Sequence, residues 1–455
     1  MKKQLQIFFD FLRFCIGSDS EIPSSLKEAD WKELYAIAQK QCLVGILFDG
    51  IKKLPAEHVG MEKELLLHWM AESQMLEKAN VRLNNAAIQV SEWFRKKGFR
   101  TCILKGQGNA LMYPNPYSRT PGDIDIWVEG GDKRVISFVR SISPHEKACY
   151  HHIEFPSYKG IDIEVHYRPS FLLCFWHDRK LQKYYERVKE EQFSHRVMLG
   201  EQEEIAIPTV EFNLIFQLTH IYAHLMNEGI GLRQLLDYYF VVCDFYKVYQ
   251  TSTNHSASFS NHPVPLSKEG STFSPSPSSS GSGDVTALRC SEPLRYKDGG
   301  ASKPSPGCAG WDRLEMSGEM SSDCAGASSA VAHSSFAASS SSAALDRVQK
   351  ELKELGLWKF AGAIMYIMQE VFGLPASRLI VPPNEKYGKF VLNEVLEAGN
   401  FGKHDERNRF GRSKLGHNLQ RVYRDMRLVR YFPAEALCEP IFRTWHFFWR
   451  LKHRR

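Results

Sequence analysis

Several features that mark other protein classes are missing from this sequence. It has no run of about 18 apolar residues, so no membrane-spanning helix is expected. Its ten cysteines include no C-x-x-C pair, which argues against a zinc site or a disulfide framework and favours reduced thiols in a cytoplasmic protein. The phosphate-binding pattern G-x-x-x-x-G-K-S/T and the zinc-protease pattern H-E-x-x-H are also absent, and we find no internal repeat.

The N-terminal stretch MKKQLQIFFDFLRFCIG lacks the marks of a signal peptide. Asp10 and Arg13 interrupt its apolar residues and no small-residue cleavage site follows, so we expect an amphipathic helix. The whole chain has 455 residues, 43% hydrophobic and 24% charged, which is typical of a soluble protein with two or three domains. A net charge of +6 is too small to indicate nucleic acid as a partner.

Hydrophobic periodicity and composition divide the chain into five parts. Residues 1–95 follow a helical pattern, 96–208 contain short alternating strands bounded by Gly and Pro, and 209–250 return to helix. Residues 251–345 contain 26 serines and no hydrophobic periodicity, which predicts a disordered insertion. Residues 346–455 are expected to form a C-terminal helical region. Its end, FRTWHFFWRLKHRR, predicts an amphipathic helix that closes the domain, with nucleic acid or an anionic membrane as the alternative contact.

The segment SRTPGDIDIWVEG places two carboxylates one residue apart in a predicted strand. Asp123 and Asp125 alternate with Ile124 and Ile126, so both carboxylates point to the same face. Two carboxylates this close repel each other unless a cation lies between them or one is protonated. Their hard oxygen atoms suit Mg²⁺. The alternative is the solvent-exposed face of an ordinary antiparallel strand.

A second segment, GIDIEVHYRP, repeats the pattern. Asp162, Glu164 and His166 share one face, and alternation alone does not choose between the two acids. If the two strands lie side by side, three or four carboxylates gather at one edge of a sheet. A phosphoryl-transfer site with two metal ions roughly 4 Å apart needs such a group.

The helical part contains further polar residues at helical spacing. His220 and His224 lie on one face of a predicted helix, where helix packing or substrate contact is a more ordinary role than zinc binding. Arg233 and Asp237 also lie four residues apart, which predicts an ion pair within the helix.

The segment ILKGQGNALMYPNPYSRTPGDIDIWV resembles the signature of the uncharacterised nucleotidyltransferase family, within the DNA polymerase β-like superfamily. That signature has Lys-Gly after a strand, then an Arg, a D-x-D, and a strand that ends in acid-x-His. The matching residues are Lys105, Gly106, Arg119, Asp123, Asp125, Glu164 and His166. The segment HIYAHLMNEGIGLRQLLDYYFV is similar to the helical region of the family. The resemblance covers most of residues 30–250 and, more weakly, 346–440. Two departures are the absence of the superfamily's usual Gly-Ser and the serine-rich insertion.

The resemblance implies an α+β fold, with a small nucleotidyltransferase sheet and helices flanked by helical N-terminal and C-terminal regions. It implies transfer of a nucleoside monophosphate from a nucleoside triphosphate to a hydroxyl of an unknown acceptor. Mg²⁺ or Mn²⁺, as two ions, is the expected cofactor, held by catalytic Asp123, Asp125 and Glu164. Lys105, Gly106 and Arg119 are the expected nucleotide-binding residues, because two of them carry positive charge and the third can bring backbone N–H groups near phosphate.

Two other functions remain open from the sequence. One is a catalytically degenerate member that binds a nucleotide or a partner without turnover. The other is a toxin-like module that modifies RNA or protein. Intact carboxylates favour an enzyme over the first, and activity on bulk transfer RNA would favour the second.

Overall fold

The computed structural model describes residues 3–200, 203–255, 341–403, 405, 407 and 414–453. Most of the predicted insertion, residues 256–340, therefore lies outside the described residues. The helices on its two sides, α9 (Leu232–His255) and α11 (Ser341–Glu354), extend several residues into the predicted insertion, residues 251–345. None of the helices in the described part of the chain is long and apolar enough to cross a membrane.

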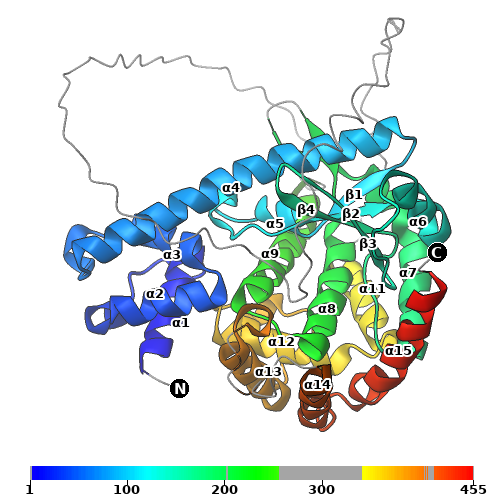
Figure 1. The fold of residues 1–455 in the computed structure, drawn as a ribbon. Helices are drawn as coiled ribbons and strands as arrows, with labels where there is room; N and C mark the ends of the chain where they lie inside the picture. Colours follow the sequence, from blue (N-terminus) through cyan, green and yellow to red (C-terminus); the bar gives the residue numbers. More distant parts are fainter. Residues whose placement is uncertain are drawn as a thin grey trace, which may run out of the picture.

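The N-terminal region is helical, as predicted. It consists of α1 (Lys3–Ile16), α2 (Trp31–Gln41), α3 (Val44–Ile51) and the long α4 (Lys63–Lys96). The first of these is amphipathic and buries Phe8, Phe11 and Leu12 against its neighbours. Helix α4 reaches from these helices to the sheet and lies along it (Figure 1). It therefore links the N-terminal helices to the part of the chain that carries the paired carboxylates.

The central sheet has four strands in the order β1-β2-β4-β3. The strands are β1 (Thr101–Leu104), β2 (Ile124–Val128), β3 (His152–Tyr158) and β4 (Ile161–His166). Strands β2 and β4 run parallel, whereas the two outer pairs are antiparallel. The short helix α5 (Gly106–Ala110) follows β1, and α6 (Gly131–Ile142) connects β2 to β3.

Alternation gives the two faces of this sheet different chemistry. Ile124, Ile126, Ile163 and Val165 point to one side, where they pack with α4 and α6 in a buried apolar cluster. The opposite side carries the acidic and histidine side chains. Burial of the isoleucine face fixes the strand register, because a slip of one residue would turn every carboxylate into the core.

The remaining chain is helical apart from a two-stranded hairpin of β5 (Arg196–Met198) and β6 (Glu204–Ala206). The helices are α7 (Phe175–Ser194), α8 (Val210–Asn227), α9, α11, α12 (Trp358–Glu370), α13 (Glu385–Ala398), α14 (Lys414–Leu428) and α15 (Pro433–Lys452). Helices α8 and α9 occupy the centre of this region, and α15 runs along its edge (Figure 1). The predicted α+β fold with flanking helical regions is confirmed.

Candidate active site

The structure brings three of the predicted site residues together at one edge of the sheet. Asp125 on β2 is the register partner of Glu164 on the parallel strand β4, and Asp123 directly precedes β2. One carboxylate oxygen from each of the three lies within 4.8 Å of those of the other two. Asp162 shares their face but is exposed and lies one same-face step, about 6.6–6.8 Å, back along β4. Geometry thus distinguishes Glu164 from Asp162.

Positively charged and histidine side chains surround the buried member of this trio. Asp125 is 4% exposed, and its Oδ1 lies 2.9 Å from Lys105 Nζ and 2.9 Å from His166 Nε2. His166 Nε2 also lies 3.4 Å from Glu164 Oε2. On its other side, Lys105 Nζ lies 3.1 Å from Nε2 of His220 on α8. Lys105 therefore bridges the carboxylate edge of the sheet and the central helix.

The backbone at Lys105 adopts an uncommon conformation that directs this side chain. Lys105 has φ +52° and Gly106 has φ +42°, so two successive residues lie at positive φ between β1 and α5. A residue with a Cβ at positive φ costs on the order of 1–3 kcal/mol, and such strain collects at functional sites. Helix α5, which the sequence permitted after Gly106, has only five residues. The sharp turn therefore aims Lys105 across the sheet edge.

The neighbouring cations hold the buried carboxylates in their charged form. Burial by itself would raise the pKa of Asp125, but Lys105 and His166 outweigh it and hold that pKa well below its usual range. Burial likewise opposes ionisation of Glu164, yet the charge of His152 and the hydrogen bond with His166 lower its pKa to about 2. Both acids are thus ionised at neutral pH, which is the state a divalent cation binds.

Arg119 lies away from this trio, in a buried ion pair with α9. Its Nε and Nη2 donate to the two carboxylate oxygens of Asp237, each at 2.8 Å, and Tyr113 donates its hydroxyl to Oδ1 of the same residue at 2.6 Å. Arg119 is 4% exposed. A contact between Arg119 and phosphate, as the resemblance implies, would require this pair to open.

The predicted ion pair between Arg233 and Asp237 within α9 is wrong. Asp237 accepts two hydrogen bonds from Arg119, because the two guanidinium N–H groups match the two carboxylate oxygens, and one from Tyr113. Arg233 Nη1 instead donates to the Thr120 carbonyl at 3.1 Å. The loop just before Asp123 is thus tied to α9 at two points.

The two histidines of α8 have separate partners. His220 contacts Lys105, whereas His224 Nδ1 lies 3.5 Å from Glu228 Oε2. Burial, together with the charge of Lys105, keeps the pKa of His220 well below its usual value. His220 is therefore neutral at pH 7, and a neutral imidazole nitrogen can accept a hydrogen bond from the Lys105 ammonium group.

Sequence reasoning missed His152 as part of this site. Its Nδ1 lies 3.3 Å from Glu164 Oε2, and it is the register partner of His166 across the antiparallel pair β3–β4. From the sequence alone, the adjacent His151 and His152 are interpreted as chance neighbours in a strand or loop, because the pairing of β3 with β4 is needed to place His152 in the site.

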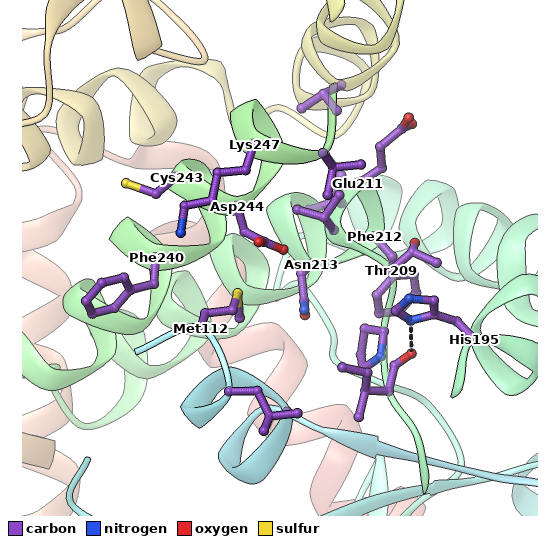
Figure 2. A pocket seen from close by; sticks show the side chains of 18 of the residues that line it. Met112, His195, Thr209, Glu211, Phe212, Asn213, Phe240, Cys243, Asp244 and Lys247 are labelled. Carbon is purple, nitrogen blue, oxygen red and sulfur yellow. Dashed lines mark hydrogen bonds between the residues drawn. The ribbon is translucent and has the colours of Figure 1, made fainter. Parts of the chain in front are cut away.

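A cavity of 1460 Å³ lies elsewhere, between α7, α8, α9 and α11. Figure 2 shows side chains that line it, among them Met112, Asn213 and Lys247. None of Asp123, Asp125 and Glu164 lines this cavity. Two ion pairs, Arg347 with Glu211 at 2.7 Å and Arg187 with Glu351, lie in its lining. Because the trio lies outside it, we assign this cavity no part in the chemistry of the sheet edge.

Comparison with known proteins adds one finding. Residues 27–248 match a family model described as "Uncharacterised nucleotidyltransferase". The matched segment contains the trio of carboxylates, Lys105, the Arg119–Asp237 pair and both central helices up to Val248. No curated protein and no solved structure matches the chain.

Proposed function

Since the chain belongs to the uncharacterised nucleotidyltransferase family through residues 27–248, we propose that it transfers a nucleoside monophosphate from a nucleoside triphosphate to a hydroxyl group. One observation carries this proposal: Asp123, Asp125 and Glu164 converge to within 4.8 Å at the edge of the sheet, two of them ionised by their surroundings. Three carboxylates this close need positive charge beside them, which Lys105, His152 and His166 supply here and which a divalent cation would supply in their place.

The donor atoms at this edge fit Mg²⁺ or Mn²⁺. All three donors are carboxylate oxygens, the ligand type these hard cations prefer. When bound, such ions would neutralise phosphate charge and favour ionisation of the attacking hydroxyl. Asp123, Asp125 and Glu164 are the residues that would hold them, with two ions as the expected number.

The reaction makes one bond to the α-phosphorus and breaks another. The acceptor oxygen bonds to the α-phosphorus and its proton passes to solvent, the bond from that phosphorus to the bridging oxygen breaks, and pyrophosphate leaves with the bonding pair. Lys105 would contact a phosphate oxygen, because its ammonium group already lies beside the carboxylates. Glu164, with a pKa of about 2, is better suited to hold a cation than to remove the hydroxyl proton, since an effective base has a pKa near the working pH.

A second candidate is binding of a nucleotide without turnover. The observation that favours it is the occupation of Asp125 Oδ1 by two partners, Lys105 and His166, both at 2.9 Å. If these contacts persist when nucleotide binds, Oδ1 of Asp125 cannot serve as a metal ligand. The two functions therefore differ in whether Lys105 leaves Asp125.

The two candidates are separated by the fate of a labelled phosphate. The purified protein is incubated with Mg²⁺, cell extract and triphosphates that carry the label at either the α or the γ position. We expect an acceptor fraction to gain the α label and not the γ label, and Asp125→Asn to abolish this transfer. Binding of the triphosphate with no α label in any fraction would support binding without turnover.

A further inference from the structure

A second group of metal-binding side chains lies beside the three carboxylates. Cys149, His151 and His152 surround the start of β3, and one donor atom from each lies within 4.8 Å of the other two. Cys149 Sγ is 3.9 Å from His151 Nδ1, and His151 Nε2 is 3.0 Å from His152 Nδ1. The spacing of the cysteines in the sequence predicts no zinc site, but the fold places the thiol of Cys149 beside the imidazoles of His151 and His152.

Backbone hydrogen bonds hold this segment in place without help from an ion. The Cys149 N–H donates to the His152 carbonyl at 2.9 Å, and the Tyr167 N–H donates to the His151 carbonyl at 3.0 Å. The Tyr150 N–H donates to Nε2 of His446, on α15, at 3.1 Å. Because the backbone is fixed on both sides, ion binding would require little ordering of the chain.

The donor types separate this group from the trio. Thiolate and imidazole are the ligands of zinc-type ions, whereas the trio offers only hard oxygen atoms. Cys149, His151 and His152 are each partly exposed, so an ion can reach them. His152 Nδ1 also lies 3.3 Å from Glu164 Oε2, which makes Glu164 the nearest further donor.

From this geometry we propose that Cys149, His151 and His152 form a binding site for one zinc-type divalent ion, next to the carboxylate site. Three protein ligands leave a fourth position, which Glu164 or water fills. The site would fix His152 against the end of β4 and so anchor the loop before β3 to the strand that carries Glu164. It does not depend on nucleotidyl transfer, since none of its three ligands belongs to the trio.

The test uses Co²⁺ as a spectroscopic substitute for Zn²⁺. The full-length protein is stripped with a chelator, reduced, and titrated with Co²⁺ alone. We expect an absorption band of a cobalt–thiolate bond that saturates at a single equivalent and disappears when Zn²⁺ is added. Absence of a saturable thiolate band in the folded wild-type protein would overturn the proposal.

Variants show whether the band comes from Cys149. Cys149→Ser should lose the band, and His151→Ala should weaken Zn²⁺ binding by about tenfold or more. The matched control is Cys174→Ser, because Cys174, His177 and Glu435 form another mixed cluster with donor atoms within 4.8 Å. A band that survives in Cys149→Ser, or vanishes only in Cys174→Ser, would place the ion elsewhere and refute the assignment. Thermal melts of the metal-free variants check that each still folds.

One further variant separates this proposal from the proposed function. Asp123→Asn should abolish transfer of the α label yet leave the cobalt band unchanged. Loss of the band in Asp123→Asn would mean that the thiolate-bound ion depends on the trio, which would refute a second, separate site. Retention of the band in a wild-type protein without transfer activity would support the zinc-type site and contradict the proposed function.

Discussion

Removing the charge of Asp237 should destabilise the protein strongly, because Asp237 is the carboxylate with which the buried Arg119 pairs. Both side chains are almost fully buried, at 5% and 7% exposure. Breaking a buried ion pair by neutralising one partner typically costs about 3–5 kcal/mol of unfolding free energy, since the other charge stays buried. Asp237→Asn also weakens the acceptor of the Tyr113 hydroxyl at 2.6 Å. We expect a loss at the upper end of that range.

Urea denaturation monitored by circular dichroism measures this loss as a lower midpoint at unchanged slope. The matched control is Glu385→Gln, which breaks the exposed pair of Glu385 with Lys389 and should leave the midpoint where it is. A triple variant, Arg119→Met with Asp237→Leu and Tyr113→Phe, removes the three hydrogen-bonded side chains and should recover part of the stability, because Arg233 stays buried and loses the charge of Asp237. An Asp237→Asn midpoint equal to that of Glu385→Gln would refute the reasoning.

Three further outcomes are expected. In the α-label transfer assay, Asp125→Asn and Glu164→Gln should each remove nearly all activity while the protein stays folded, with a lower melting temperature for Asp125→Asn because Lys105 loses its buried partner. Asp162→Asn should keep most of the activity; the reverse order for the two acids of β4 would contradict the observed register. Mg²⁺ with a triphosphate should raise the melting temperature more than either alone, and by less in Lys105→Ala; calorimetry that shows equal shifts would contradict this. Burial and nearby positive charge lower the pKa of His446 from 6.5 to about 4. The neutral imidazole therefore contributes fully to the free energy of unfolding above pH 6.5, and this contribution is lost as the pH falls towards 4. His446→Gln should therefore flatten the fall in stability between pH 6.5 and 4, and an unchanged fall would contradict the assignment.

Residues that share a strand face were predictable from the sequence. A strand has a side-chain period of two, so Asp123 and Asp125 had to share a face whichever strand they paired with. The apolar residues between them also had to face a core, and Ile124 and Ile126 do so. The fold class followed for the same reason, since helical and strand periodicities are properties of short windows.

Contacts that depend on strand pairing or on distant packing were not predictable in this way. The parallel pairing of Asp125 with Glu164 depends on α6 carrying the chain across the sheet, which no local window contains. The Arg119–Asp237 pair joins residues 118 positions apart, so the neighbour at helical spacing, Arg233, was the natural but wrong partner. The positive φ of Lys105 was also hidden, because this conformation is ordinarily expected at glycine.

The charge balance at the sheet edge explains why metal and nucleotide should depend on each other under the proposed function. Asp125 and Glu164 are already neutralised by Lys105, His152 and His166, so a divalent cation alone would add charge to a site that needs little more. A triphosphate alone, by drawing Lys105 towards its phosphate oxygens, would leave Asp125 without that counter-charge. With both present, Lys105 can leave Asp125 for a phosphate oxygen, and Asp125 is then free for a cation. The triphosphate thus draws the positive charge of Lys105 away from Asp125, and the cation replaces that charge. The binding of each ligand therefore depends on the other through Lys105.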